Sequence, residues 1–521
     1  MSKHLFHLPW RYVISLYLLL TAVNVAGAQV KINGSAMSYA GMTLVVSMEA
    51  DYISHLSTIL ATSPIGDDGK FYVSFSIDEV REVFLHVGSS RAVLYATPDK
   101  TYELIISPPG KDSQRKFDRT EVGLMFVKPD MTDINMFIPK FDADYDAFVN
   151  EHYLDFAQQE FAGSETYKAS RGEDLAKSGL RNVEEKKDTA ALANQQASGA
   201  ELVHEFKAEM FSRYAQWQSN DFAYQYMRYR IAELELVASG FRAELYKEYF
   251  FSQPFLYNHP AYMQFFSTFF QYELTDALKG KKKDCLMQSV NAWRDFGATE
   301  RCLGDNPLLT VEHMRHMVVL LGLRKAWHEE LLLRDAIDEV LNKAVTQSKP
   351  EKVGVIAKNL QTSLGRHKLG WTPESFALPG VRRDTLYSDD LRGHFVYYYF
   401  YTSWSTTAKK EIQLLKKIHE QYKDVVTIVC INMDDNYNTF MEDMSNYRDC
   451  DWSFVYGAAD PLLRDKFNVR TIPHACLVDT EGRYLYDYTS KPAEGVDGLF
   501  QPLVARVKQQ HPGQGQKSWK D

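Results

Sequence analysis

Cysteine is scarce in this 521-residue sequence, which contains five cysteines and no Cys-x-x-Cys pair. Five are too few for a disulfide scaffold in so long a chain, and the odd number leaves at least one thiol unpaired within the chain. We therefore expect the stability of the protein to come from ordinary hydrophobic cores. Whether Cys285 and Cys302 form a structural disulfide is left open at this point.

The sequence also lacks an excess of positive charge and long apolar runs. Its formal net charge is −9. Non-specific binding to nucleic acid depends on a basic surface, so we expect no nucleic-acid partner. Beyond the N-terminal segment, no apolar stretch approaches the roughly 20 residues of a transmembrane helix, so no integral membrane segment is expected in the mature chain.

The N-terminal segment has the pattern of a secretory signal peptide. Lys3 and Arg11 precede an apolar run from Tyr12 to about Ala26, and Ala26-Gly27-Ala28 follows as a small-residue cleavage site. We expect a signal peptide over residues 1–28 and cleavage after Ala28, with an uncleaved anchor as the alternative. No cysteine near this site could accept a lipid, which favours a soluble exported protein.

The region after the signal peptide has the pattern of short β-strands. Apolar and β-branched runs at residues 42–46, 71–75 and 82–87 are separated by turn signals, of which Gly66-Asp67-Asp68-Gly69 is the clearest. Strands at this spacing predict a small antiparallel β-sandwich over residues 29–140.

The central region changes to helical periodicity. Aromatic residues recur at offsets of three and four at Tyr262, Phe265, Phe266 and Phe269, which indicates one buried helical face rather than a peptide groove. This pattern predicts an all-helical domain over residues 141–350. Between Gly163 and Gly199 the sequence is polar, and we expect an exposed helix or a mobile excursion there.

From Trp371 onward, strand-like and helix-like segments alternate. Residues 394–401 and 425–433 are expected to be strands, 408–421 and 460–467 helices, and 474–479 with 484–488 a hairpin. Such alternation predicts a mainly parallel sheet covered on its faces. The α/β domain is expected over residues 366–508, before a disordered tail at 509–521. The fold class is therefore multidomain α+β.

The C-terminal residues resemble the TlpA-like thioredoxins that bacteria export to the cell envelope. In that family a strand leads into a Trp-Cys-x-x-Cys motif that opens a helix, and a cis-proline faces the motif. Here the corresponding residues are Trp404-Ser405-Thr406-Thr407-Ala408, and Pro473 in Thr471-Ile472-Pro473-His474 matches the cis-proline. More weakly, the turn at Asp67–Phe71 is similar to an uncharacterised β domain that often precedes such thioredoxins in Gram-negative envelope proteins.

Ser405 and Ala408 stand where the family has its two cysteines. A thioredoxin works through a thiolate that attacks a disulfide and a second thiol that resolves the mixed disulfide. Serine and alanine can do neither, so the resemblance implies a degenerate active site without a catalytic residue. We also expect no cofactor and no metal. Ser405, Thr406 or Thr407 is expected to cap the following helix instead.

The other cysteines offer no clear replacement. Cys430 and Cys476 fall in strands expected to flank the motif-bearing strand, nearly 10 Å apart at about 4.8 Å per strand. A disulfide needs Cα atoms within about 7 Å, so we expect two buried, inert thiols. Cys450 lies between Asp449 and Asp451, whose charges should raise its pKa and reduce its reactivity.

The leading hypothesis is a non-catalytic exported protein of the periplasm or cell envelope of a Gram-negative bacterium, which binds a protein or peptide partner. The expected binding residues surround the degenerate motif and the proline: Trp404, Thr406, Thr407, Ile472, Pro473 and His474. Two alternatives stay open. One is a thiol-disulfide oxidoreductase or antioxidant protein that uses a remote cysteine, and the other is a structural component of an outer-membrane complex. The oligomeric state is not predicted.

Overall fold

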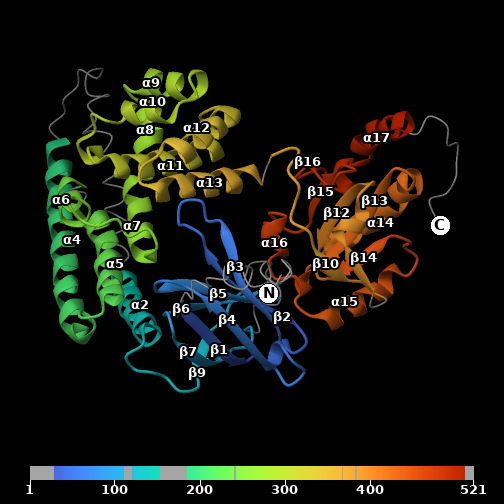
Figure 1. Cartoon of the computed structure of the whole chain (residues 1–521), viewed down its shortest axis with the longest axis horizontal. Coiled ribbons are helices and arrows are strands. Elements are labelled where there is room, and N and C mark those ends of the chain that lie inside the picture. Colours follow the sequence, from blue (N-terminus) through green and yellow to red (C-terminus); the bar gives the residue numbers. More distant parts are fainter. Residues whose placement is uncertain are drawn as a thin grey trace, which may run out of the picture.

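The computed structural model describes residues 28–110, 120–152, 185–239, 242–366, 368–381 and 384–510. Figure 1 shows a β domain (blue), a helical domain (green to yellow) and an α/β domain (orange to red) in sequence order, which confirms the predicted α+β class. Within these ranges, no helix combines the length and the apolar character needed to cross a bilayer. Nearly all of the predicted signal peptide, and the tail from residue 511, lie outside the described residues.

The N-terminal domain consists of two sheets. Its strands are β1 (Gln29–Ser35), β2 (Thr43–Glu49), β3 (Ser57–Pro64), β4 (Lys70–Ser76), β5 (Arg81–Val87), β6 (Ser90–Ala96), β7 (Thr101–Ile106), β8 (Thr120–Glu121) and β9 (Leu124–Phe126). One sheet has the order β4-β1-β7-β9 and the other β3-β2-β5-β6-β8. Buried apolar residues of both sheets share one core. The two sheets confirm the predicted β-sandwich, but two pairings, β1 with β7 and β6 with β8, are parallel, so the sandwich is not antiparallel throughout.

The middle domain is helical, as predicted. Its helices are α2 (Ile134–Glu151), α4 (Glu185–Arg213), α5 (Asp221–Ser239), α6 (Arg242–Tyr249), α7 (Pro260–Phe270), α8 (Glu273–Lys279), α9 (Lys283–Met287), α10 (Phe296–Cys302), α11 (Glu312–His328), α12 (Arg334–Gln347) and α13 (Glu351–Gly365). The helical region therefore begins before the predicted residue 141, at Ile134, and ends after the predicted residue 350, at Gly365. The aromatic stripe of α7 is buried in the main core. In the polar stretch 163–199, residues from 185 belong to α4, and 163–184 lie outside the described residues.

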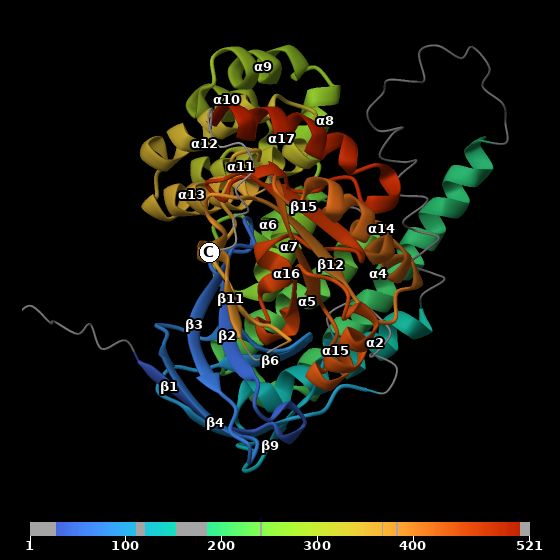
Figure 2. The same cartoon turned by 90° about the vertical axis from the view of Figure 1, so that its right-hand side faces the viewer.

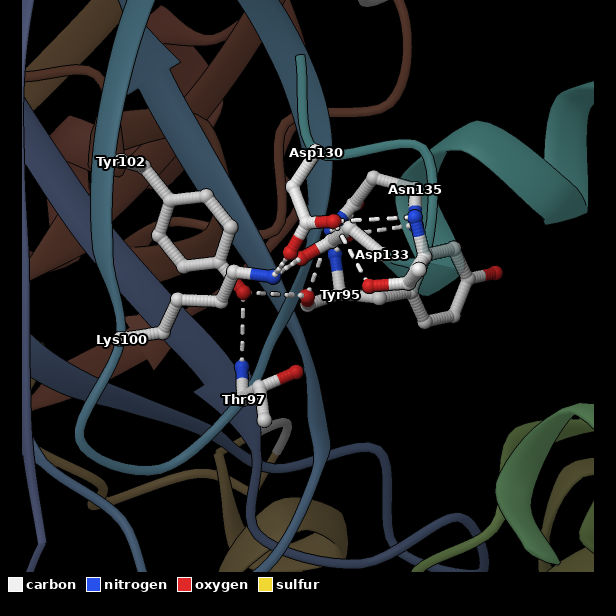
Figure 3. A network of polar contacts seen from close by, with 8 residues as sticks. Tyr95, Thr97, Lys100, Tyr102, Asp130, Asp133 and Asn135 are labelled. Carbon is white, nitrogen blue, oxygen red and sulfur yellow. Dashed lines mark hydrogen bonds and ion pairs between the residues drawn. The ribbon is translucent and has the colours of Figure 1, made fainter. Parts of the chain in front are cut away.

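A polar network joins the first two domains (Figure 3). The side chain of Asn135 accepts a hydrogen bond from the N–H of Tyr95 at 2.9 Å and donates one to its carbonyl at 2.8 Å, as a neighbouring strand would. Asp133 caps α2 by accepting from the N–H of Asn135 at 2.7 Å. Lys100 Nζ lies 2.5 Å from Asp133 and 2.8 Å from Asp130. Because buried polar groups need partners, this network holds the first turn of α2 against β6.

The C-terminal domain is built on a five-stranded sheet of order β14-β13-β12-β15-β16. Its elements are β10 (Ala377–Pro379), β11 (Thr385–Tyr387), β12 (Phe395–Tyr401), α14 (Thr406–Tyr422), β13 (Val426–Asn432), α15 (Tyr437–Asp443), β14 (Ser453–Tyr456), α16 (Leu463–Lys466), β15 (His474–Val478), β16 (Tyr484–Tyr486) and α17 (Asp497–Gln510). The strands β12, β13 and β14 are parallel, whereas β15 and β16 run antiparallel. The sheet is thus mixed rather than mainly parallel, and the predicted hairpin is present.

The central strand β12 is buried along its whole length. Tyr397, Tyr399 and Tyr401 belong to the core on the face of the sheet that packs against α14 and α17, and Tyr398 and Phe400 belong to the core on the opposite face. A strand covered on both sides needs apolar or aromatic residues at every position, which explains its unbroken apolar sequence. Figure 2, which faces this domain, shows it in front of the helical domain.

Candidate functional site

The degenerate motif links β12 to the first turn of α14. Ser405 is the N-cap of α14, and its Oγ accepts a hydrogen bond from the N–H of Ala408 at 3.2 Å. The predicted capping by Ser405 is therefore confirmed, because this bond satisfies one of the free N–H groups of the first turn. Ala408 is fully buried, whereas Thr406 and Thr407 are exposed. At this turn the two positions offer a hydroxyl and a methyl group, and no sulfur.

The proline loop lies beside the end of β12. The peptide bond between Ile472 and Pro473 is cis, as the resemblance implies. Pro473 immediately precedes β15, and the first residue of that strand, His474, pairs with Phe400 of β12. Ile472 and Pro473 are half-buried. The loop therefore presents part of its surface beside the strand that carries the motif.

His474, one of the expected binding residues, lies inside the domain rather than at its surface. Its side chain is buried, and its ring lies 5.7 Å from that of Phe400 and 5.5 Å from that of Tyr488, between ring centroids. Burial lowers the pKa of His474 to about 4, so the imidazole is neutral at physiological pH. Because His474 is the first residue of β15, its side chain lies inside the domain and packs against aromatic rings.

Trp404 is 45% exposed and lines a cavity of about 370 Å³. The cavity lies at the carboxyl ends of β12, β13 and β14, the edge at which α/β sheets commonly bind ligands. The turn between β5 and β6 closes one side, so the N-terminal domain contributes to the wall. The lining residues are Gly88, Ser89, Thr402, Trp404, Met433, Asp434, Asp435, Asn436, Thr439, Ala458, Asp460, Pro461 and Arg464.

Two adjacent carboxyl groups dominate the polar wall of this cavity. Asp434 accepts hydrogen bonds from the N–H of Ser403 at 3.1 Å and from Asn432 Nδ2 at 2.9 Å. Burial raises the pKa of Asp435, a hydrogen bond with Ser89 lowers it, and the charge of Asp434 raises it again. The hydroxyl of Thr402 is buried and has no hydrogen-bond partner among the described residues. The cavity can therefore bind polar groups.

Of the six predicted binding residues, Trp404 alone lines this cavity. Thr406 and Thr407 lie on the adjoining surface of α14, and Ile472 and Pro473 on the neighbouring loop. Sequence reasoning missed Asp434 and Asp435. Their position directly after the predicted strand 425–433 was a usable signal, because residues at strand ends form such sites.

Cys430 in β13 and Cys476 in β15 flank β12, as predicted. They also belong to different cores, so their side chains lie on opposite faces of the sheet. Both are fully buried, and burial raises the pKa of each thiol far above its ordinary value. Trp452 Nε1 lies 3.2 Å from the sulfur of Cys430. Neither thiol can reach the other or the solvent.

Cys450 is half-buried beside Lys416. Burial raises its pKa to about 11, the charge of Lys416 opposes this, and Asp449 and Asp451 add to it. The direction is the one we expected, although burial is the larger cause. Cys285 and Cys302 are joined by a disulfide with a Cα–Cα distance of 5.9 Å, between α9 and α10 of the helical domain.

Residues 393–484 match the family model described as thioredoxin-like. No curated protein matches this chain. Among solved structures, the thioredoxin domain of a thiol-disulfide oxidoreductase from Bacteroides vulgatus is 20% identical, with 27% of this chain and 98% of that chain covered and a TM-score of 0.24. A thiol:disulfide interchange protein from Bacteroides sp. is 17% identical, with coverages of 28% and 96% and a TM-score of 0.25. The C-terminal domain of this protein is a thioredoxin-like domain.

Proposed function

We propose that this protein is a non-catalytic exported envelope protein whose thioredoxin-like domain binds a protein or peptide partner instead of exchanging disulfides. The first turn of α14 carries this proposal, because it holds Ser405 and Ala408 where the resemblance places two cysteines. A hydroxyl cannot form a mixed disulfide, and a methyl group cannot resolve one. The neighbouring features that the resemblance implies, a capped helix and a cis peptide bond at Pro473, are both present.

The environments of the remaining thiols support the absence of redox activity. The thiolate is the reactive form of cysteine. Burial raises the pKa of Cys450 to about 11, so its side chain is almost entirely in the unreactive thiol form at pH 7. Cys430 and Cys476 are still less acidic and have no access to solvent. The alternative of an oxidoreductase that uses a remote cysteine therefore has no suitable group among these three.

The surface around Trp404 supports partner binding. An indole that is nearly half exposed beside a cavity is the kind of anchor on which partner residues pack. In thioredoxins the residue before the cis-proline pairs its backbone with the substrate peptide, which is strand addition. We propose that the partner contacts Trp404, the exposed Thr406 and Thr407, and the loop at Ile472 and Pro473.

Two features support export. Lys3, Arg11 and the apolar run after them form the pattern of a signal peptide. The disulfide between Cys285 and Cys302 is typical of proteins in an oxidising compartment such as the periplasm. We propose that the mature protein resides in the periplasm or cell envelope of a Gram-negative bacterium.

Insulin reduction driven by dithiothreitol tests the loss of redox chemistry. The natural mature protein should not accelerate the reaction above the rate with dithiothreitol alone. A variant with Ser405→Cys and Ala408→Cys should accelerate it, and Ser405→Cys alone should not, because it lacks the resolving thiol. If the natural protein reduces insulin and Cys450→Ser abolishes this activity, the remote-cysteine alternative is correct.

Site-specific photo-crosslinking in the native envelope tests partner binding. A crosslinking amino acid at the exposed Thr407 should yield a discrete adduct with one protein or peptide. The same group at Lys247, which is exposed on α6 of the helical domain, is the control and should not yield that adduct. Trp404→Ala should reduce the adduct at Thr407. The absence of any adduct at Thr407 contradicts the proposed partner surface.

A further inference from the structure

A second cavity, of about 530 Å³, lies where all three domains meet. Its walls come from β2, β5 and β6, from the helices α11 and α13, and from α16 with the segment that leads to Pro473. In a protein with a net charge of −9, this cavity is lined by five arginines, Arg91, Arg324, Arg366, Arg464 and Arg470. Two carboxylates, Glu49 and Asp465, share the lining.

Several of these charges are already balanced. Arg91 lies 2.5 Å from Glu121, and Arg366 lies 2.6 Å from Glu374. Glu49 Oε2 lies 2.9 Å from His55 Nδ1, a contact that is an ion pair only when the imidazole is protonated.

Arg324 and Arg470 are different. Neither has a carboxylate within ion-pair distance among the described residues, and the hydrogen bond of Arg470 goes to the amide oxygen of Asn468 at 2.9 Å. The two unpaired guanidinium groups come from two different domains.

The surroundings of Arg324 make an unpaired state costly. It projects from α11, most of whose residues are buried, and is itself half-buried. Burial lowers the pKa of Arg324, the charges of Glu49 and Asp51 oppose this shift, and the charge of Arg470 makes a smaller contribution in the same direction as burial. A partly buried cation that faces a second cation is stabilised strongly by an anion between them. The planar guanidinium group binds carboxylate and phosphate through paired hydrogen bonds.

We propose that this cavity binds a small molecule that carries at least two negative charges on phosphate or carboxylate groups, held between Arg324 of the helical domain and Arg470 of the thioredoxin-like domain. The cavity has the size of a small-molecule site. Arg91 contributes from the N-terminal domain, so the ligand contacts all three domains. Arg470 also lies two residues before Ile472, so an occupied site restrains the loop at Pro473. This inference does not depend on whether the thioredoxin-like domain has redox activity.

Calorimetric titration and thermal unfolding of the mature protein test the site, with pyrophosphate and citrate as probes. At least one probe should bind saturably with a dissociation constant below about 1 mM and raise the unfolding temperature, because a ligand of the folded state stabilises it. Sodium chloride at equal ionic strength should not reproduce the increase. Preference for pyrophosphate identifies a phosphate ligand, and preference for citrate identifies a carboxylate ligand.

Matched charge variants separate a built site from a general charge effect. Arg324→Gln and Arg470→Gln should each weaken binding about tenfold or more, because each removes a charged hydrogen-bond donor. Arg301→Gln and Arg506→Gln remove the same charge at exposed positions of the same two domains and should change affinity by less than about twofold.

The exposed Arg470 can be replaced without disturbing a core, so this variant keeps the test valid if Arg324→Gln fails to fold. The proposal is overturned if neither probe binds, and binding of a penta-glutamate peptide in that case would point to an acidic peptide as the ligand instead. It is also overturned if all four variants weaken binding equally.

Discussion

The phenolic hydroxyl of Tyr399 donates a hydrogen bond of 2.6 Å to Oε2 of Glu411 inside the C-terminal domain. Tyr399 belongs to β12, and Glu411 lies on α14 one turn after Ala408, and both side chains are buried. Burial raises the pKa of Glu411, while Tyr399 and the charge of Lys491 lower it. The bond therefore ties the helix that begins at the degenerate motif to the central strand of the sheet.

Tyr399→Phe should destabilise the domain by about 1–3 kcal/mol at neutral pH, because it leaves a buried carboxylate short of a donor. It should also raise the pKa of Glu411 further. A group whose folded pKa is raised contributes stability at low pH and loses it as the pH rises through that pKa. The loss of stability caused by Tyr399→Phe, measured by urea unfolding, should therefore be smaller near pH 4 than at pH 7. When Glu411→Gln is added to the Tyr399→Phe variant, this pH dependence should disappear. If Tyr399→Phe alone loses equal stability at both pH values, Glu411 is not the group responsible.

Glu82 should make stability fall as the pH rises towards neutrality. Burial and then the charge of Glu49 raise its pKa to about 7, and the hydroxyl of Tyr95 donates to it at 3.3 Å and opposes the shift. Between about pH 4.3 and pH 7 the folded protein retains a proton that the unfolded chain has released, so stability decreases over this window.

Glu82→Gln should accordingly be more stable than the natural protein at pH 8, on the order of 1–2 kcal/mol, and similar to it near pH 4. Urea unfolding across this pH range measures the difference. Glu103→Gln removes a carboxylate of β7 that pairs with Lys128 at the surface at 3.1 Å, and as the control it should not reproduce the gain at pH 8. A constant difference between Glu82→Gln and the natural protein at all pH values contradicts the shifted pKa.

Loss of the disulfide should weaken the helical domain. The two cysteines are 17 residues apart in sequence, and a cross-link of this loop length contributes about 3 kcal/mol, mainly by restricting the unfolded chain. The double variant Cys285→Ser and Cys302→Ser should have a free energy of unfolding that is lower by about 3 kcal/mol, and it should therefore unfold at a lower urea concentration. Cys450→Ser should unfold like the natural protein. Identical unfolding of the natural protein with and without reductant contradicts the presence of the bond.

Alkylation by iodoacetamide should distinguish the three free thiols. In the native protein we expect Cys450 to react slowly, at a rate that rises with pH up to about 11, since the thiolate is the reactive form. Cys430 and Cys476 should react only after unfolding, because both are fully buried. Peptide mass spectrometry locates the label. Labelling of Cys430 or Cys476 in the folded protein at neutral pH contradicts their placement in the two cores.

Local features of the fold could be predicted closely. The run at β12 lacks polar residues, which indicates a strand covered on both faces, and the structure buries all of it. Ser405 before a helical pattern predicted an N-cap, because capping depends on neighbouring residues alone. By contrast, β14 and α15 were missed: they are short and their sequences lack a clear period. The parallel pairing of β1 with β7 depends on strands far apart in the chain.

The candidate site could be predicted only in part. The sequence located Trp404 and the proline loop, but it gave no sign that the turn at Ser89 closes the neighbouring cavity. His474 follows the proline and looks accessible in sequence, yet strand pairing places its ring in the core. Arg324 and Arg470 lie on separate elements with no shared motif, so no local pattern could bring them together.

The sequence by itself determined the order of the domains, the strands and helices with strong periodicity, and the absence of cysteine at the start of α14. These properties depend on residues close together in the chain, where side-chain size, hydrogen bonding and backbone preference act directly. Only the tertiary structure decided that Cys430 and Cys476 lie in separate cores and that three domains enclose an arginine-lined cavity. Both results depend on packing between distant segments, where burial and charge are set by neighbours that the sequence does not place.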